Sequence, residues 1–345
     1  MRCRRNILRP GRAALLLAAL ALGSGLLGGA AEAEPVRILV VDSYHLEYPW
    51  SAGIRHGINE VLGVDPGPPG RALSRDGRYD VWTEFMDTKR QPDPAKVQQA
   101  ARRVAGVVES WKPAVVIACD DNAVRDLVVP YLLGRETPVV YCGVNWDASV
   151  YGLPDRNVTG MIEVDQTGEL VATLRPLARG DRLGLLVIDS TSGRRDVDAL
   201  RTYVGLDLLV RLVPDYPSWK AAFAELQDQV DMLLIKQNVA GVAGWDLADA
   251  VRFTFEATRI PTGCTTEPTM PCVLVAYIKN PDEQGIWAAR TALEILAGAS
   301  PESITPGVKH DSRVFLNISL ARKQGVRFPM ALIERATFME ERWSP

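Results

Sequence analysis

Residues 36–63 read VRILVVDSYHLEYPWSAGIRHGINEVLG, and this stretch decides the fold class. Residues 36–41 form an uninterrupted apolar run rich in Val and Ile, which is typical of a strand buried on both faces. Pro49 and Ser51 then begin a helix, and Gly63 is placed to end it. The apolar face of this helix consists of Ile54, Ile58, Val61 and Leu62. The stretch therefore predicts a buried strand followed by a crossover helix.

The same alternation of short apolar runs and helical periodicity continues along the chain. Strands are predicted at 81–86, 114–118, 139–141, 183–188, 206–212, 232–235 and 273–278. Helices are predicted from Asp93-Pro94, at 122–133, from Arg194, from Ser218, at 245–257 and from Asp282 to Leu296. Such alternation predicts parallel sheets with crossover helices.

A loop rich in Gly, Pro, Asn and Asp, residues 147–160, divides this pattern into two halves. We therefore expect an α/β protein of two Rossmann-like lobes joined by a hinge. Lobe 1 is expected at 34–157 and lobe 2 at 158–280. Residues 281–345 are expected to cross over, with part of them returning to lobe 1.

The N-terminus has the composition of an export signal. Five Arg residues precede an apolar stretch at 13–30, and Ala31-Glu32-Ala33 supplies an A-x-A cleavage site. The alternative is an uncleaved membrane anchor, but four Gly residues interrupt the apolar stretch. Arg4-Arg5 also resembles a twin-arginine signal, so both general and twin-arginine export stay open. We expect residues 1–33 to be a cleaved signal peptide and the mature protein to be periplasmic.

The charge of the mature chain bears on its partners. Residues 34–345 carry 34 basic and 41 acidic side chains, a formal net charge of −7. No basic stripe stands out, so we expect no nucleic-acid partner. The 312 remaining residues are many for a single core and suit two lobes.

Four cysteines follow the signal segment, in a compartment where disulfides persist. Cys264 and Cys272 bracket a loop with little other means of holding its shape, so we expect a structural disulfide between them. Cys119 and Cys142 each end an apolar run. They are explained equally well as a pair or as small buried side chains.

The segment after the first predicted strand is unusually rich in aromatic residues. Ligands of open α/β sheets bind outside the carboxyl ends of the strands. Rings there offer stacking faces, and Tyr and Trp add a polar tip. We predict ligand contacts from Ser43, Tyr44, His45, Tyr48 and Trp50. For Tyr48 and Trp50, packing against the first helix is the alternative.

Polar side chains also follow other predicted strands of both halves. The candidate ligand contacts among them are Asp121, Asn122, Asn145, Trp146, Thr191, Ser192, Gly193 and Gln237. The Thr191-Ser192-Gly193 turn stands at a helix start, where backbone N–H groups bind anions. Ordinary capping of that helix by Ser192 is the alternative. Polar groups at the strand ends of both halves predict a ligand cleft.

Motifs for catalysis and cofactor binding do not occur in the mature chain. It has no G-x-S-x-G, H-E-x-x-H, P-loop or dinucleotide glycine sequence. His45, His56 and His310 are its only histidines, and they lack metal-ligand spacing. We therefore expect no enzymatic activity, no metal and no cofactor.

A set of short motifs resembles one group of ABC-transporter substrate-binding proteins. The motifs are residues 38–45 (ILVVDSYH), 48–50 (YPW), 86–90 (MDTKR), 119–122 (CDDN), 139–145 (VVYCGVN) and 158–160 (VTG). This group is related to tryptophan- and tyrosine-binding components. The same module resembles extracellular sensor regions of histidine kinases and diguanylate cyclases.

The resemblance implies a type I periplasmic-binding-protein fold whose two lobes close on a ligand. It implies that this protein binds a small polar or aromatic solute and delivers it to an ABC permease in the inner membrane. We expect the protein to be a monomer. The alternative is a periplasmic sensor that signals to a membrane receptor kinase or cyclase. The chain departs from the group at 263–272, where a Trp-containing loop is usual, so the ligand's identity does not transfer.

Overall fold

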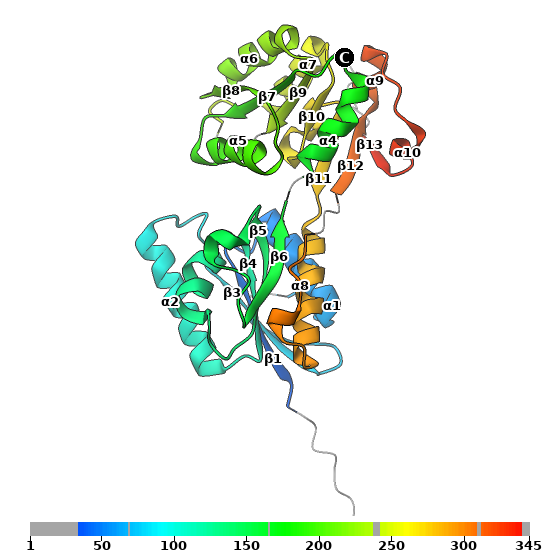
Figure 1. Cartoon of the computed structure of the whole chain (residues 1–345). Helices are drawn as coiled ribbons and strands as arrows, with labels where there is room; N and C mark the ends of the chain where they lie inside the picture. The colour runs from blue at the N-terminus through cyan, green and yellow to red at the C-terminus, as the bar shows by residue number, and fades with distance from the viewer. Residues whose placement is uncertain (1–33, 68–69, 165, 237–241, 309–311, 340–345) are drawn as a thin grey trace, which may run out of the picture. The chain divides into compact units, whose positions relative to one another are not determined.

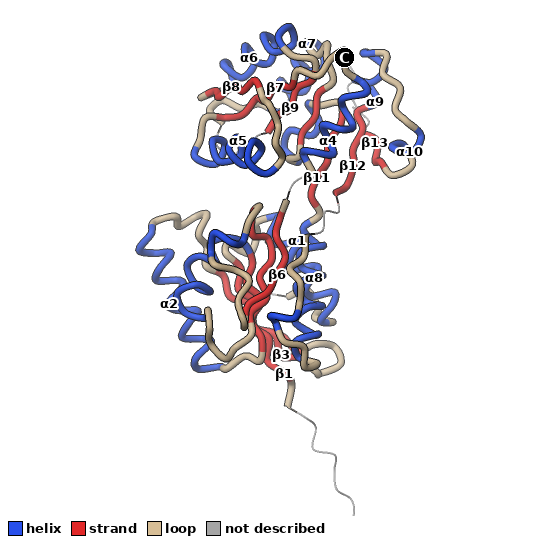
Figure 2. The backbone as a smooth tube through the Cα atoms, in the orientation of Figure 1, coloured by secondary structure: helices blue, strands red, loops and turns tan. Residues whose placement is uncertain are grey.

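The computed structural model describes residues 34–67, 70–164, 166–236, 242–308 and 312–339. These residues form two β-sheets, and helices lie on both faces of each (Figure 1, Figure 2). The neighbours in each sheet are mostly parallel, as the alternating sequence pattern predicts.

The first sheet has six strands in the order β2-β3-β1-β4-β5-β6. Only β2 is antiparallel to its neighbour. The strands are β1 Val36–Asp42, β2 Gly70–Leu73, β3 Tyr79–Phe85, β4 Val115–Cys119, β5 Val139–Asn145 and β6 Val158–Glu163. β4 is buried along its whole length, which explains its unbroken apolar sequence.

Two apolar layers cover this sheet. Helices α1 (Pro49–Leu62) and α8 (Pro281–Leu296) pack on one face. Helix α2 (Pro94–Trp111) packs on the other, together with the short helix α3 (Asp120–Ala123) and the π-helix η1 (Val124–Leu132). The short 3₁₀ helices η2 (Ala148–Tyr151) and η6 (Pro301–Ser303) lie in connecting segments.

The second sheet has seven strands in the order β13-β12-β11-β10-β9-β7-β8. Strands β11 and β12 are antiparallel, and the other neighbours are parallel. The strands are β7 Leu183–Ile188, β8 Leu209–Val213, β9 Met232–Lys236, β10 Thr262–Cys264, β11 Val275–Lys279, β12 Ser312–Asn317 and β13 Ala336–Met339.

Helices again cover both faces of this sheet. One core cluster holds α4 (Thr167–Leu174), α5 (Thr191–Tyr203), α9 (Ile318–Gln324) and α10 (Met330–Ile333). The short 3₁₀ helix η3 (Arg175–Leu177) follows α4. The opposite cluster holds α6 (Tyr216–Gln229), α7 (Leu247–Ala257) and the 3₁₀ helix η5 (Glu267–Cys272).

The division of the chain between the sheets differs from the expected boundaries. β6 pairs with β5, so residues 158–163 belong to the first sheet and not to the second lobe. The chain returns to the first sheet in α8 and then adds β12 and β13 to the second. Three connections thus link the two sheets: β6 to α4, β11 to α8 and η6 to β12.

The expected disulfide between Cys264 and Cys272 is absent. The two cysteines are buried in the same core cluster but are not bonded to each other. The Cys264 thiol donates to the carbonyl of Thr266, and the hydroxyls of Thr266 and Thr269 are 2.8 Å apart. The predicted disulfide is wrong because hydroxyl hydrogen bonds and η5 hold this loop.

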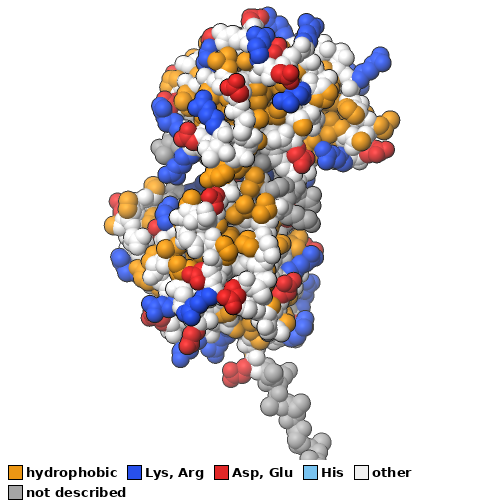
Figure 3. All heavy atoms as spheres, in the orientation of Figure 1, with side chains coloured by type: hydrophobic (Ala, Val, Ile, Leu, Met, Phe, Trp, Pro, Cys, Tyr) orange, Lys and Arg blue, Asp and Glu red, His pale blue; other side chains and the backbone are white. Residues whose placement is uncertain are grey.

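The face of the protein shown in Figure 3 carries Lys, Arg, Asp and Glu side chains interspersed with one another. Among the described residues, no helix is both long enough and apolar enough to cross a membrane.

Helices α1 and α8 approach each other closely because glycine lies at their contact. A Cβ atom added to Gly57 would lie 2.3 Å from the carbonyl oxygen of Asp282. One added to Gly285 would lie 2.0 Å from the carbonyl oxygen of Ile54. Neither distance is sterically possible, so any side chain at these positions forces the helices apart.

Gly285→Ala should therefore destabilise the protein, by about 1–3 kcal/mol as for other overpacked contacts. The matched control is Gly106→Ala in α2, where an added Cβ meets no atom within 4 Å. This control should gain about 0.5–1 kcal/mol, because alanine favours a helix interior. Urea unfolding of both variants measures the difference. Equal midpoints would refute the close contact.

Candidate functional site

Each sheet reverses its strand order at one place. In the first sheet, β2 and β3 lie on one side of β1, and β4, β5 and β6 lie on the other. In the second sheet, β8 lies on one side of β7, and β9 and all later strands lie on the other. Ligands of open α/β sheets bind outside the carboxyl ends of the strands at such a point. The residues that follow β1, β4, β7 and β9 are therefore the candidate functional site.

Asp42 anchors the segment after β1. Its buried carboxylate accepts hydrogen bonds from the Ser51 hydroxyl at 2.7 Å, the Tyr44 backbone N–H at 3.0 Å and Arg55 at 3.1 Å. Burial raises the pKa of Asp42, and the hydrogen bonds and the charge of Arg55 offset part of that rise. This network fixes where the aromatic segment leaves the strand.

Ser43 and Asn122 direct their polar atoms into the protein. The Ser43 hydroxyl donates to the Cys119 carbonyl at 2.6 Å and accepts from the Ala123 N–H at 2.8 Å. The Asn122 amide donates to the Thr88 hydroxyl at 2.7 Å, which itself donates to the Ser43 carbonyl. These bonds tie β1 to the ends of β3 and β4.

Tyr44, His45 and Tyr48 form an aromatic cluster beyond β1. The rings of Tyr44 and Tyr48 meet edge to face at 4.9 Å, and His45 lies 5.7 Å from Tyr48. The Lys89 ammonium lies 4.4 and 4.6 Å from the two tyrosine centroids, within cation–π range. His45 Nδ1 is 3.7 Å from Asp87, too far for a hydrogen bond. Burial raises the pKa of Tyr44.

Trp50 contacts both the first sheet, through Asp120, and one of the connections that link the two sheets, through Lys279. The Lys279 ammonium is 5.3 Å from its ring centroid and also forms an ion pair with Glu163. Lys279 ends β11 and Glu163 ends β6. The ring of Trp50 therefore contacts the ion pair that joins two of the three connections.

Asp120 is a buried residue that the sequence analysis did not select. It adopts a left-handed backbone conformation with φ 70°. Its Oδ1 accepts from the Trp50 indole at 2.9 Å, and its buried Oδ2 has no hydrogen-bond partner among the described residues. Burial and the charges of Asp42 and Glu163 raise the pKa of Asp120. A Cβ at Gly143 would lie 2.8 Å from Oδ1, so glycine there makes room for this carboxyl.

The carboxylate of the neighbouring Asp121 has hydrogen-bond partners different from those of Asp120. Its carboxylate accepts from the Asn145 amide at 2.5 Å and from the Tyr151 hydroxyl at 2.9 Å. Trp146 stacks on Tyr203 of α5, with ring centroids 5.8 Å apart. Asp121 and Asn145, predicted separately, are thus brought together at the ends of β4 and β5.

At the end of β7, the helix cap differs from the expected one. Helix α5 begins at Thr191, with Ser192 second, and Ser190 caps it. The Ser190 hydroxyl accepts from the Gly193 N–H at 3.0 Å. A Cβ at Gly193 would lie 2.2 Å from the Ile188 carbonyl oxygen, so only glycine fits. Gln237 lies outside the described residues.

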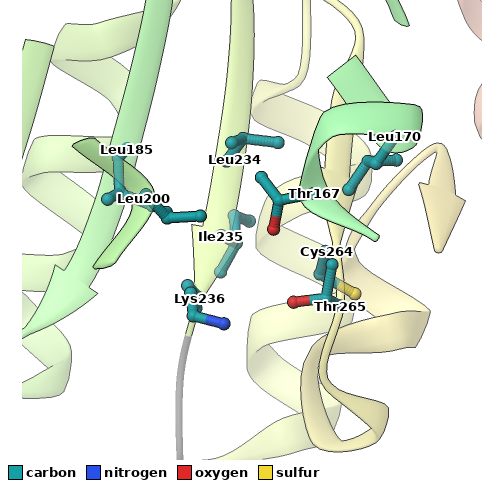
Figure 4. A pocket seen from close by; sticks show the side chains of 9 residues that line it. All are labelled: Thr167, Leu170, Leu185, Leu200, Leu234, Ile235, Lys236, Cys264 and Thr265. Atoms are coloured by element: carbon teal, nitrogen blue, oxygen red, sulfur yellow. The ribbon is translucent and has the colours of Figure 1, made fainter. Parts of the chain in front are cut away.

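A small hollow lies beside the ends of β9 and β10 (Figure 4). Its free volume is about 10 Å³, which is room for about one water molecule. Lys236 ends β9, Thr265 follows β10, and Thr167 begins α4. The remaining lining residues are Leu170, Leu185, Leu200, Leu234, Ile235 and Cys264. Lys236 is not among the residues predicted from the sequence, whereas its neighbour Gln237 is.

The described residues contain no group of three His, Cys, Asp or Glu side chains placed to hold a metal ion.

Comparison with known families identifies the chain. The model of the ABC transporter substrate-binding protein family matches residues 94–339, which is more than half of its length. The chain belongs to that family. Members of this family bind small ligands and deliver them to permeases, and they act outside the cytoplasm. The expectation drawn from the sequence motifs is thereby confirmed at the level of the family.

Solved structures of substrate-binding proteins share the fold. The ligand-free, open form of CD0873, a substrate-binding protein with adhesive properties from Clostridium difficile, has a TM-score of 0.65 at 18% identity, covering 88% of this chain and 99% of that one. An ABC domain from Streptococcus pneumoniae in complex with L-Trp has a TM-score of 0.53 at 16% identity, covering 87% and 99%. These similarities support two α/β lobes of the type I periplasmic-binding-protein fold. No curated protein matches the sequence significantly.

Asp120→Asn should stabilise the protein at neutral pH, by about 1 kcal/mol, because it removes a buried carboxyl with an unpaired oxygen. Asparagine tolerates a positive φ and keeps the acceptor for Trp50. The raised pKa means that the folded state holds its proton more tightly than the unfolded state does. Wild-type stability therefore falls as pH rises above about 4, and the advantage of the variant shrinks as pH falls toward 4.

Denaturant unfolding at pH 4.5 and pH 7 measures this effect. Asp42→Asn is the control, because Asp42 is also buried but pairs with Arg55. Breaking that pair should cost about 3 kcal/mol at pH 7. If Asp120→Asn were less stable than wild type at pH 7, its carboxyl would have a structural role instead.

Proposed function

We propose that this protein is the periplasmic substrate-binding component of an ABC importer, which binds a small polar or aromatic organic solute by closure of its two lobes. The observation that carries the proposal is the gathering of aromatic rings and charged groups at the strand-order reversal of the first sheet, with Lys236 at the end of β9 in the second. The family supports binding as the activity, so the solute should be released chemically unchanged.

The ligand contacts in the first lobe would come from residues with accessible polar tips or ring faces. Tyr44, Tyr48 and Trp50 would stack against a flat group, with His45 beside them. Asp121 and Asn145 would orient a polar group, since an amide offers donors and an acceptor. Ser43 and Asn122 would act by fixing the strand ends, because their side chains are bonded internally.

The second lobe would contribute Thr191, Ser192, Gly193 and Gln237, as the sequence analysis proposes, and Trp146 would lie near the hinge. The three connections between the sheets would form that hinge. Closure requires that the solute bind the closed form more tightly than the open one. The Glu163–Lys279 ion pair ties two of the connections, so a solute on the ring of Trp50 would act directly on the hinge.

Export and delivery complete the proposal. Residues 1–33, which lie outside the described residues, would direct export and be removed in the periplasm. The mature protein would act as a monomer and present its closed form to a permease. Deleting the gene should abolish uptake of the radiolabelled solute, and export-competent protein should restore it.

A thermal-shift screen across amino acids, aromatic acids, sugars and nucleosides should identify the solute. At about 100 times its Kd, a true ligand adds roughly 2.7 kcal/mol of stability. The bound solute should be recovered intact by mass spectrometry. A chemically altered product, or no stabilising compound in any class, would contradict the proposal.

Tyr44→Ala should weaken binding of that solute by about 0.5–1.5 kcal/mol while leaving the fold intact, because it removes an aromatic face on which a ring can stack. Tyr79→Ala is the matched control, since Tyr79 is also a half-buried tyrosine but lies at the opposite end of the same sheet. Calorimetric titration measures both variants. Equal affinities for the two would place the solute away from the aromatic segment.

A further inference from the structure

Cys119 and Cys142 lie directly opposite each other in the first sheet. Cys119 ends β4, and Cys142 is its register partner on the parallel neighbour β5 (Figure 1). Register partners in a parallel pair project their side chains to the same face of the sheet. Both side chains accordingly belong to the apolar layer between the sheet and helices α1 and α8, and both are fully buried. The two thiols are therefore neighbours in a region from which water is excluded.

The spacing of the two strands suits a disulfide. Neighbouring strands lie about 4.8 Å apart, and disulfides join cysteines whose Cα atoms are roughly 4.4–6.8 Å apart. The two cysteines form the last pair of the β4–β5 ladder. Asp120 and Gly143, which follow them, adopt left-handed backbone conformations with φ 70° and 71°. Because regular pairing ends at this point, the backbone can adjust to bring the two sulfur atoms together.

The other two cysteines of the mature chain lack this placement. Cys264 lies on β10, whose partner in register on β11 is Ala276, and Cys272 ends the 3₁₀ helix η5. The Cys264 thiol donates to the carbonyl of Thr266. Cys264 and Cys272 thus share no ladder, and they serve as an internal reference for the opposed pair.

The folded structure also determines when a bond between Cys119 and Cys142 can form. Both are thiols in this structure. The hydrogen bond with the Cys142 side chain and burial raise the pKa of the Cys119 thiol well above its usual value. Only the thiolate attacks a disulfide, so a buried, protonated thiol does not react with an external oxidant. The bond must therefore form while the chain folds, before the helices cover this face of the sheet.

We propose that Cys119 and Cys142 are an oxidisable pair, whose disulfide cross-links β4 to β5 as the chain folds outside the cytoplasm. The oxidant is another disulfide, such as that of oxidised glutathione. One cysteine thiolate attacks this disulfide, which forms a mixed disulfide and releases one thiol. The other cysteine thiolate then attacks the protein sulfur of the mixed disulfide and releases the second thiol. The two protein thiols lose two electrons and two protons, and the oxidant gains them.

The cross-link holds the strand ends that carry the candidate site. Asp121 and Asn145 lie beyond the two cysteines on the same two strands, and the Asn145 amide donates to the Asp121 carboxylate. A covalent bond at the last pair of the ladder fixes the separation of β4 and β5 at the edge where these side chains meet. The inference goes beyond the proposed function and takes from it only the location outside the cytoplasm, where disulfides persist.

The test refolds the reduced, guanidinium-unfolded mature protein in a buffer of oxidised and reduced glutathione. The remaining thiols are then alkylated in guanidinium, and the proteolytic digest is analysed by mass spectrometry without reduction. The peptide with Cys119 should be joined to the peptide with Cys142, and the joined pair should be lighter by two hydrogen atoms than the two reduced peptides. Cys264 and Cys272 should both be alkylated.

Urea unfolding with and without dithiothreitol gives a second measurement. The reductant should lower the urea midpoint of the oxidised wild type, because opening the cross-link gives the unfolded chain more conformational freedom. Cys142→Ala should remove this effect of the reductant and leave Cys119 alkylated. The matched control is Cys264→Ala, which should keep the effect. If Cys142→Ala fails to fold, Cys119→Ala takes its place, with Cys142 alkylated instead.

Three results would overturn the inference. One is alkylation of all four cysteines after refolding with glutathione. Another is a bond from Cys119 or Cys142 to a different cysteine. The third is an effect of dithiothreitol on the urea midpoint that persists in Cys142→Ala and Cys119→Ala. The binding of a solute is measured separately, so the proposed function stands or fails on its own screen.

Discussion

The parallel pairing of β1 with β4, and of β7 with β9, is the constraint on which the rest of the structure depends. Parallel strands place all their carboxyl ends at one edge of a sheet. Because each sheet reverses its order between these strands, the connecting helices diverge there and leave the edge uncovered. Whatever polar or aromatic residues follow these strands are therefore gathered at one place, however far apart they lie in sequence.

The groups gathered at the two edges differ in kind. The first edge carries three aromatic rings, with lysine ammonium groups on their faces and carboxylates nearby. The second carries a buried lysine beside an apolar hollow.

Asp120 departs from what stability alone would select. Its backbone lies in a conformation that glycine or asparagine adopts more readily, and one oxygen is buried without a hydrogen bond. The glycine at 143 is required to accommodate it. A buried position selected for stability alone would carry an apolar residue instead of such a carboxyl. The place of Asp120 at the strand-order reversal therefore favours a functional role for this residue.

The sequence by itself determined the α/β class, the positions of β1, β4, β7 and β9, and the aromatic segment at 44–50, because buried parallel strands and amphipathic helices leave periodic apolar patterns. It did not reveal β2, β6, β10, β12 or β13, which are short strands with little apolar pattern of their own. Because residues 147–160 were taken as a dividing loop, the lobe boundary was placed before β6, which pairs with β5 in the first sheet. Only the tertiary structure paired Asp121 with Asn145, linked Trp50 to Asp120, and placed Lys236 in a hollow. These contacts join residues from different strands, and their distances depend on strand order, which local sequence does not encode.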